Sequence, residues 1–304
     1  MKIFPTLIAT AVLLWAGTPA VAEDEVGQKT CLGCHADLSK DYDDTVHAKV
    51  FTGSDARHPS VSRGCESCHG PGRTHAMSAG SDQSGAGWLT FNEEGEPSAD
   101  AQSAACLQCH QGDTQKHWVG STHASRGLSC STCHTVMKTV SRQNLLAKPT
   151  EAALCRQCHH LPGAQSKRAS HMPTRQEVGK FGSEDFMTCS SCHNAHGTVA
   201  DMLVDAHTIN DNCTSCHAEK RGPFLWEHSP VSESCLNCHV AHGSLKPNLL
   251  RVSAPRLCQS CHVQVLHPSE ARVPESRFVV GQNCMQCHSQ VHGSNHPSGA
   301  FLTR

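Results

Sequence analysis

The chain has 304 residues, a formal net charge of −2 at pH 7, and only 13 aromatic side chains among Phe, Trp and Tyr. Lysine and arginine are scattered, and no basic run contains interleaved aromatic residues, so nothing in the sequence indicates nucleic-acid binding. Such sparse apolar content would indicate disorder in a chain without cofactors, whereas 20 cysteines and 24 histidines indicate that cofactors are bound.

Residues 1–22 are predicted to be a secretory signal peptide. Lys2 gives a short basic start, residues 3–15 are mostly apolar, and Ala20-Val21-Ala22 forms a small-x-small cleavage site. The apolar stretch is shorter than the roughly 20 residues that span a bilayer, so we expect cleavage rather than an uncleaved anchor. The mature chain, residues 23–304, would then be exported.

The phrase Cys-x-x-Cys-His occurs ten times along the mature chain and uses every cysteine. This phrase is the attachment signal for c-type haem: the two cysteines form thioethers with the haem vinyl groups, and the histidine becomes the proximal iron ligand. Structural zinc is the alternative, but zinc knuckles do not need a histidine after every second cysteine. The predicted attachment residues, numbered here as motifs 1–10 in chain order, are Cys31 and Cys34, Cys65 and Cys68, Cys106 and Cys109, Cys130 and Cys133, Cys155 and Cys158, Cys189 and Cys192, Cys213 and Cys216, Cys235 and Cys238, Cys258 and Cys261, and Cys284 and Cys287. The predicted proximal ligands are His35, His69, His110, His134, His159, His193, His217, His239, His262 and His288.

The remaining histidines repeat in a pattern that predicts five two-haem modules, at about 31–75, 106–137, 155–196, 213–242 and 258–292. In each module one histidine lies between the two motifs, and one ligand-type residue follows the second motif. In the first four modules this middle histidine follows the proximal histidine of the first motif by 11 to 13 residues. His267 follows His262 by only 5, but its distance of 21 residues to the next proximal histidine, His288, fits the pattern. The predicted distal ligands are His47, His75, His123, Met137, His171, His196, His228, His242, His267 and His292.

A residue three positions after a proximal histidine cannot easily reach the far side of its own iron, so we expect it to ligate the partner haem of its module. Met137 stands where other modules have histidine, and a thioether ligand there would raise the haem potential. The alternative is that Met137 packs on the porphyrin while a spare histidine such as His117 ligates. The spare histidines, expected to be solvated or bonded to propionates, are His58, His117, His160, His207 and His296, with His207 or His296 as substitutes for His267.

The predicted fold is an elongated multihaem cytochrome, mostly irregular with short helices and little or no β-sheet. The mature chain offers roughly 28 residues per haem, so the porphyrins must supply the apolar core, and the chain without haem should not fold. Residues 76–105 are predicted to be a surface loop between the first two modules, or alternatively a cap at one end of the protein. Similar joints at 144–146, 201–203 and 248–250 are expected to form short helices or turns that lead into the next motif.

The ten motifs, the C-H-x-x-H-G phrases ending at Gly197 and Gly243, and the closing V-H-G-S-N-H-P-S-G over 291–299 resemble the periplasmic decahaem cytochromes of the MtrA/DmsE type. The resemblance implies a haem wire that sits inside an outer-membrane β-barrel and carries electrons between periplasm and cell exterior. It also implies redox partners on either side and histidine as both ligands of every iron, from which Met137 departs.

Three functions remain open at this point. The first is the electron conduit, with the protein in the periplasm, associated with the outer membrane, and no catalytic residues. The second is a periplasmic multihaem shuttle without a barrel. The third is a multihaem oxidoreductase, which would need one iron with an open position. Binding of carbon monoxide to the reduced protein distinguishes the third, and the sequence leaves the direction of electron flow open.

Overall fold

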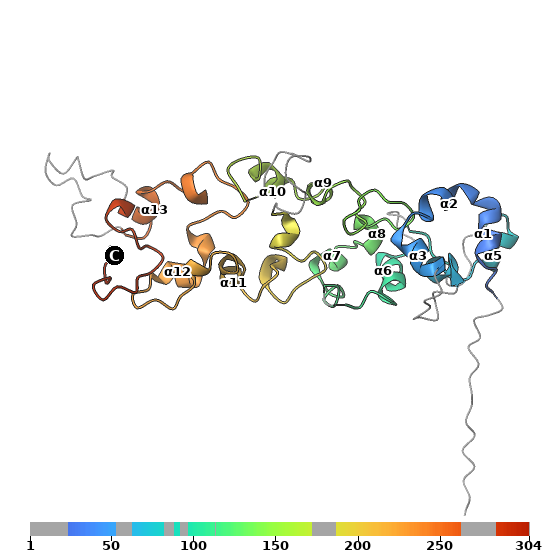
Figure 1. Cartoon of the computed structure of the whole chain (residues 1–304), viewed down its shortest axis with the longest axis horizontal. Helices are drawn as coiled ribbons and strands as arrows, with labels where there is room; N and C mark the ends of the chain where they lie inside the picture. Colours follow the sequence, from blue (N-terminus) through green and yellow to red (C-terminus); the bar gives the residue numbers. More distant parts are fainter. Residues whose placement is uncertain are drawn as a thin grey trace, which may run out of the picture. The chain divides into compact units, whose positions relative to one another are not determined.

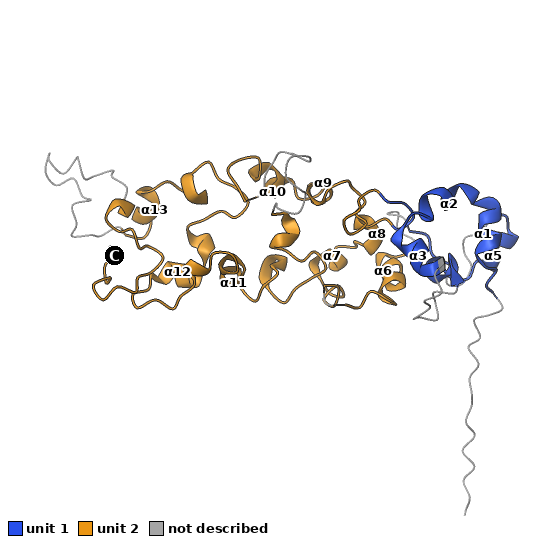
Figure 2. Cartoon of the chain, in the orientation of Figure 1, with its two compact units in different colours: residues 1–91, 136–139 blue, residues 92–135, 140–304 orange. Residues whose placement is uncertain are grey.

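The computed structural model describes residues 24–52, 63–81, 88–91, 97–112, 114–171, 187–262 and 284–303. The predicted signal peptide, His58 and His267 lie outside these residues. The chain divides into two compact units, which are described separately: unit 1 contains residues 1–91 and 136–139, and unit 2 contains residues 92–135 and 140–304 (Figure 2).

Unit 1 is built from short helices, three of which begin or end at or next to a haem motif. The backbone of His35 leaves the helical conformation at φ −106° and ψ 38°, so the first motif ends one helix and the next residue begins another. The helices of this unit are α1 (Gln28–Cys34), α2 (Ala36–Tyr42), α3 (Val46–Thr52), α4 (Glu66–His69) and α5 (Arg73–Met77).

A buried carboxylate ties the start of unit 1 to its second motif. Glu66, the first residue between the cysteines of motif 2, is only 2% exposed. Its carboxylate accepts hydrogen bonds from the backbone N–H groups of Val26, Gly27 and Gly72 at 2.8–3.3 Å. Hydrogen bonds to a charged acceptor contribute about 1.5–3 kcal/mol each, so this side chain fixes the N-terminal segment and the start of α5 against α4.

Unit 2 consists of helical turns separated by irregular connections, as Figure 1 shows. The longest helix, α6, has nine residues and begins at a Ser98 cap that accepts from the Ala101 N–H. The elements are α6 (Ala99–Leu107), α7 (Thr122–Ser125), α8 (Cys130–Cys133), α9 (Glu151–Cys155), α10 (His160–Gln165), η2 (Cys189–Ser191), η3 (Asp201–Leu203), α11 (Ile209–Thr214), η4 (Ala218–Lys220), α12 (Ser229–Glu233), η5 (Cys235–Asn237), η6 (Pro247–Leu249), α13 (Arg256–Gln259) and η8 (Cys284–Gln286), where η marks a 3₁₀ helix.

Among the described residues, extended pairing is limited to isolated antiparallel bridges. Three of them join the residue after a second cysteine to a downstream residue: His134 to Leu146, His193 to Val204, and His239 to Leu250. The described residues contain no sheet, so the predicted irregular fold with short helices is confirmed. Within the same residues no helix combines the length and apolar character needed to cross a membrane.

The protein part of the core is small. Among the described residues, the buried apolar side chains are those of Ala48, Trp118, Leu146 and Val204, and more buried side chains are polar than apolar. Large apolar side chains such as Val119 and Phe301 are about four-fifths exposed, at 83% and 78%. A chain of this length normally buries far more apolar surface, so the missing apolar core has to come from bound groups.

Candidate haem sites

All ten Cys-x-x-Cys-His motifs have the same local conformation. In each one the histidine N–H donates to the carbonyl oxygen of the first cysteine at 2.9–3.0 Å, which closes a single helical turn. Residues three positions apart on a helical turn share a face, so both thiols of a motif point to one side. None of the 20 cysteines, which all lie in the described residues, forms a disulfide. The sulfurs are therefore available for two thioethers per motif, as c-type haem requires.

The histidines of the even-numbered motifs are oriented by the backbone. Each Nδ1–H donates to a carbonyl oxygen, which leaves Nε2 as the atom that can bind iron. The hydrogen bonds run from His69 to Leu89 (2.9 Å), His134 to Asn144 (2.7 Å), His193 to Met202 (2.9 Å), His239 to Asn248 (2.7 Å) and His288 to Phe301 (2.6 Å).

The joints supply several of these carbonyl groups. Each joint contains two successive left-handed residues with φ between 50° and 58°, at 144–145, 202–203 and 248–249. Left-handed backbone outside glycine costs on the order of 1 kcal/mol per residue, and the hydrogen bonds to the motif offset that cost. The joints form turns, as expected, but they fold back under the histidine of the preceding motif. Leu302, at φ 56°, lies in a fourth turn that supplies such a carbonyl group but has a single left-handed residue, and the sequence reasoning missed it.

Within the part of the chain that the structure describes, predicted proximal and distal histidines face each other in seven pairs. The ring centroids are 6.0–6.2 Å apart. This is close to the roughly 6 Å expected when two imidazoles bind the same metal ion from opposite sides, each through a nitrogen about 2 Å from the ion. The pairs are His35 with His75, His134 with His196, His159 with His123, His193 with His242, His217 with His171, His239 with His292, and His262 with His228. The residues present therefore fit low-spin haem with two axial histidines.

The six pairs outside the first module do not follow the predicted modules. His196 follows His193 by three residues but faces His134 of the preceding module. In return, His123 of that preceding module faces His159. The same exchange occurs at the next boundary, where His171 faces His217 and His242 faces His193. It occurs again at the last boundary, where His228 faces His262 and His292 faces His239. The expectation that a residue three positions after a proximal histidine faces its module partner is therefore wrong for His196 and His242. His292, four positions after His288, shows the same exchange.

A hydrogen bond joins the two exchanged ligands at each of these boundaries. The Nδ1–H of the middle histidine donates to the carbonyl oxygen of the residue just before the other distal histidine. These bonds run from His123 to Ala195 (2.8 Å), His171 to Ala241 (3.5 Å) and His228 to Val291 (3.0 Å). Orientation of one distal ligand thus depends on the backbone that carries the other.

A glycine follows each of His196, His242 and His292 and allows this close packing. Gly197 and Gly243 have φ of 112° and 143°, which L side chains rarely adopt. A Cβ atom at either position would lie 2.3 Å from a backbone oxygen of the preceding module, that of His117 or Gln165. The C-H-x-x-H-G phrase therefore combines a ligand with the glycine that brings its backbone close enough.

The first cysteines of the two motifs in each module are neighbours. Burial and then the nearby Cys65 raise the pKa of the Cys31 thiol to about 11, and burial and then Cys235 raise the pKa of Cys213 to about 11. A hydrogen bond with Cys106 lowers the pKa of Cys130 to about 6. The same proximity joins Cys155 to Cys189 and Cys258 to Cys284. With haem attached these sulfurs are thioethers and no longer titrate, but their placement persists.

The second cysteines are neighbours across module boundaries in unit 2. Burial first, and then the adjacent thiol, raise the pKa of Cys133 beside Cys158 and of Cys238 beside Cys261. Burial and Cys216 likewise raise the pKa of Cys192, against a hydrogen bond from Asn212 that lowers it. Each motif of unit 2 thus has its first cysteine beside that of its module partner and, at a module boundary, its second cysteine beside that of the neighbouring module. Motifs 3–10 therefore follow one another in space in the order of the sequence.

A side chain just before the odd-numbered motif holds the even-numbered motif beside it. Gln102 accepts from the Ser131 hydroxyl at 2.9 Å, Glu151 accepts from the Ser190 N–H and hydroxyl at 2.6 and 2.7 Å, and Asn210 accepts from the Cys235 N–H at 2.8 Å. Sequence reasoning missed these residues, although a polar side chain three or four residues before the first cysteine is a visible signal. Glu151 also lies near Cys155 and Cys189, but both thiols belong to haem attachment.

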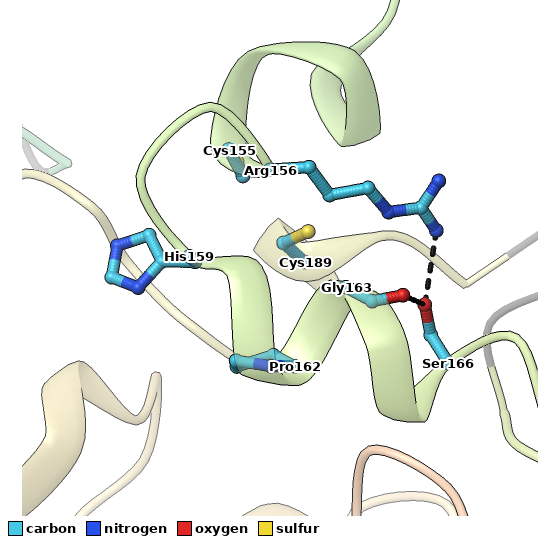
Figure 3. Close-up of a pocket in the computed structure, with 7 residues that line it drawn as sticks. All are labelled: Cys155, Arg156, His159, Pro162, Gly163, Ser166 and Cys189. Atoms are coloured by element: carbon cyan, nitrogen blue, oxygen red, sulfur yellow. Dashed lines mark hydrogen bonds between the residues drawn. The ribbon is translucent and has the colours of Figure 1, made fainter.

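Figure 3 shows the junction of motifs 5 and 6, where a small pocket lies beside both first cysteines. The Arg156 guanidinium donates to the hydroxyl of Ser166 at 3.0 Å, and that hydroxyl donates to the Gly163 carbonyl oxygen at 3.0 Å. The arginine stem thereby covers one wall of the pocket. The lining residues are Cys155, Arg156, His159, Pro162, Gly163, Ser166 and Cys189.

The remaining predicted ligands and spare histidines that the structure describes lie in half-buried or exposed positions. His47 is half-buried, with its ring 6.5 Å from that of Phe51, and its role as a distal ligand stays a prediction. Met137 is also half-buried. Of the spare histidines, His160 and His207 are exposed, and His296 accepts from the Ser298 N–H at 3.2 Å.

Comparison with known proteins agrees with these motifs. The family described as "Doubled CXXCH motif" matches residues 182–222 and 228–266, and each match contains an even-numbered motif and the odd-numbered motif after it. The chain is 38% identical over 289 residues to the multiheme cytochrome MtrA of Shewanella baltica, which covers 91% of this chain and 81% of that protein. It is 25% identical over 193 residues to the C-type polyheme cytochrome OmcB of Geobacter sulfurreducens, which covers 52% of this chain and 25% of that protein.

Proposed function

Because the chain belongs to the MtrA family of multihaem c-type cytochromes, we propose that it conducts electrons along ten covalently bound haems between the periplasm and the cell exterior. In this proposal the protein resides in the periplasm and associates with the outer membrane. It inserts into an outer-membrane β-barrel and exchanges electrons with a redox partner on each side. The haem irons supply the redox chemistry, and the chain supplies their spacing, ligands and insulation.

The observation that carries the proposal is the alternation of neighbouring cysteines. First cysteines meet within modules and second cysteines meet between modules, from Cys106 to Cys284. A cofactor attached at each motif would therefore have the preceding and following cofactors as neighbours. Such an order gives a single path along unit 2, which is what a conduit needs.

The ligand geometry supports electron transfer without catalysis. An iron held by two histidines has no open position for a substrate, so it can only accept and release an electron. Seven such pairs are formed from the predicted ligands, including His193 with His242. The Nδ1–H groups donated to backbone carbonyl oxygens fix the orientation of the imidazoles and leave Nε2 as the atom that can bind iron.

Haem content is the first expected result. The intact mass of the secreted protein should equal residues 23–304 plus ten haems, because each of the ten motifs has the attachment geometry. Thiol titration of the denatured protein should detect no reactive cysteine. Protein made with the haem-attachment machinery that carries zinc, or retains reactive thiols, would contradict the loading.

Partnership with a barrel is tested by cell fractionation. The protein should fractionate with the outer membrane when the cells make a cognate β-barrel, and should appear in the periplasmic fraction when the barrel gene is deleted. The control is an unrelated periplasmic c-type cytochrome, whose distribution should not change. Strictly periplasmic behaviour in cells that make the barrel would instead favour the shuttle function.

A further inference from the structure

Met137 is the only predicted distal ligand that is not a histidine, and its place in the chain is equivalent to that of three histidines. His196, His242 and His292 follow the proximal histidine of an even-numbered motif by three or four residues, and Met137 follows His134 by three. All four side chains are half-buried. Met137 therefore occupies a ligand position in the repeat.

The ring pairs indicate which iron this position serves. His196 faces His134, His242 faces His193, and His292 faces His239. In each case the residue behind one even-numbered motif meets the proximal histidine of the even-numbered motif before it. The same rule applied to motif 4 assigns Met137 to the proximal histidine of motif 2, which is His69.

The division of the chain into units supports this assignment independently. Residues 136–139 belong to unit 1, although the residues before and after them belong to unit 2 (Figure 2). Unit 1 contains motif 2 with His69, whereas motifs 3 and 4 lie in unit 2. The segment with Met137 thus belongs to the unit that contains the motif selected by the rule, and not to the unit of the motif that precedes it in the chain.

The surroundings of His69 fit those of a proximal haem ligand. The Nδ1–H of His69 donates to the Leu89 carbonyl oxygen at 2.9 Å, so Nε2 is the ligand atom. The rings of Trp88 and Phe91 lie 5.6 and 5.2 Å from the imidazole and provide apolar walls. A thioether suits such an apolar site better than a charged ligand would.

We infer that the Met137 sulfur is the distal ligand of the iron held by Cys65, Cys68 and His69. This assignment differs from the expectation that Met137 serves motif 3 or 4. Methionine is a weaker electron donor than imidazole and raises the potential of the haem it binds. The haem of motif 2 is then the most oxidising of the row, and electrons rest on it within unit 1.

The inference rests on the proposed haem loading but not on a barrel partner or a direction of flow, and it is tested on the complete haem-loaded protein. Met137→His should keep ten haems by mass, abolish the sulfur-to-iron charge-transfer absorption of the ferric protein, and bring the highest potential into the range of the other haems. Met77→Leu is the matched control, because Met77 is in unit 1 but 80% exposed, and it should change neither signal. If Met137→His leaves both signals unchanged, the inference is wrong; a mass below ten haems in the native protein would be a failure of loading instead.

The haem that Met137 serves is identified by marking one haem at a time. Cys65→Ala leaves one vinyl group of the motif 2 haem intact and shifts the absorption band of that reduced haem alone. The marked haem should titrate at the highest potential, whereas the haem marked by Cys130→Ala in motif 4 should titrate with the remainder. The opposite result would place Met137 on the haem of motif 4 and overturn the assignment. If the Cys65 variant is not secreted, Cys68→Ala removes the other thioether of the same haem and marks it instead. A motif 2 haem that titrates with the remainder in that variant would also overturn the assignment.

Discussion

Residues 23–304 produced in the cytoplasm without haem attachment are expected to remain unfolded. The described residues bury few apolar side chains, with Trp118, Leu146 and Val204 the largest, and leave Val119 and Phe301 largely exposed. The helices would also not persist without packing, because isolated helices of fewer than about 12–15 residues are only marginally stable in water. Circular dichroism should therefore show a disordered chain, and calorimetry should show no cooperative transition.

The secreted, haem-loaded protein is the control for this experiment, and it should be helical and melt cooperatively. Its folding free energy would then come largely from cofactor attachment, as in small metal-dependent domains. A compact and cooperatively melting chain without haem would show that a protein core exists beyond the few side chains named above. That outcome would also remove the reason for assigning the core to porphyrins.

The haem attachment motifs and the irregular fold could be predicted from the sequence because their chemistry is local. Two thioethers and one proximal ligand come from five consecutive residues, and the hydrogen bond from the histidine to the first cysteine is found in all ten motifs. The scarcity of apolar residues likewise predicted that the haems supply the apolar core. These features need no knowledge of which distant segments meet.

The exchange of distal ligands could not be predicted, because spacing does not say which way a side chain points in space. His228 is 11 residues from both His217 and His239, and neither number distinguishes its observed partner, His262. The decisive features are packing features: Gly243 lies against the backbone of the preceding module, and the His228 Nδ1–H donates to Val291. Such contacts follow from tertiary structure and leave only weak traces in one sequence.

The exchange leads to the second large expected effect: His228→Ala should create one carbon monoxide-binding haem per chain, and that haem should be the one on motif 9. The ring of His228 faces that of His262 with centroids 6.1 Å apart and planes inclined by 21°. Removal of the imidazole would leave the iron of motif 9 with its proximal ligand alone. Carbon monoxide binding to the reduced protein should therefore rise by one equivalent over the native protein.

His160→Ala is the matched control, because His160 is exposed and has no place in the ligand repeat, so carbon monoxide binding should not change. The open haem can be located by combining His228→Ala with Cys261→Ala, which marks the reduced absorption band of the motif 9 haem. Carbon monoxide should then shift the marked band. A shift confined to unmarked haems would mean that His228 serves its own module, contrary to the exchange.

The partner variant His292→Ala should open the haem of motif 8, since His292 faces His239 at 6.1 Å. The two substitutions should not act independently, because the Nδ1–H of His228 is donated to Val291, the residue immediately before His292. Residues in one hydrogen-bonded network commonly show coupling energies of about 0.5–3 kcal/mol. The midpoint of thermal unfolding in the double variant should therefore fall by an amount that differs from the sum of the decreases in the two single variants. In the control, His228→Ala is combined with Met77→Leu in the other unit, and the decreases in the unfolding midpoint should add.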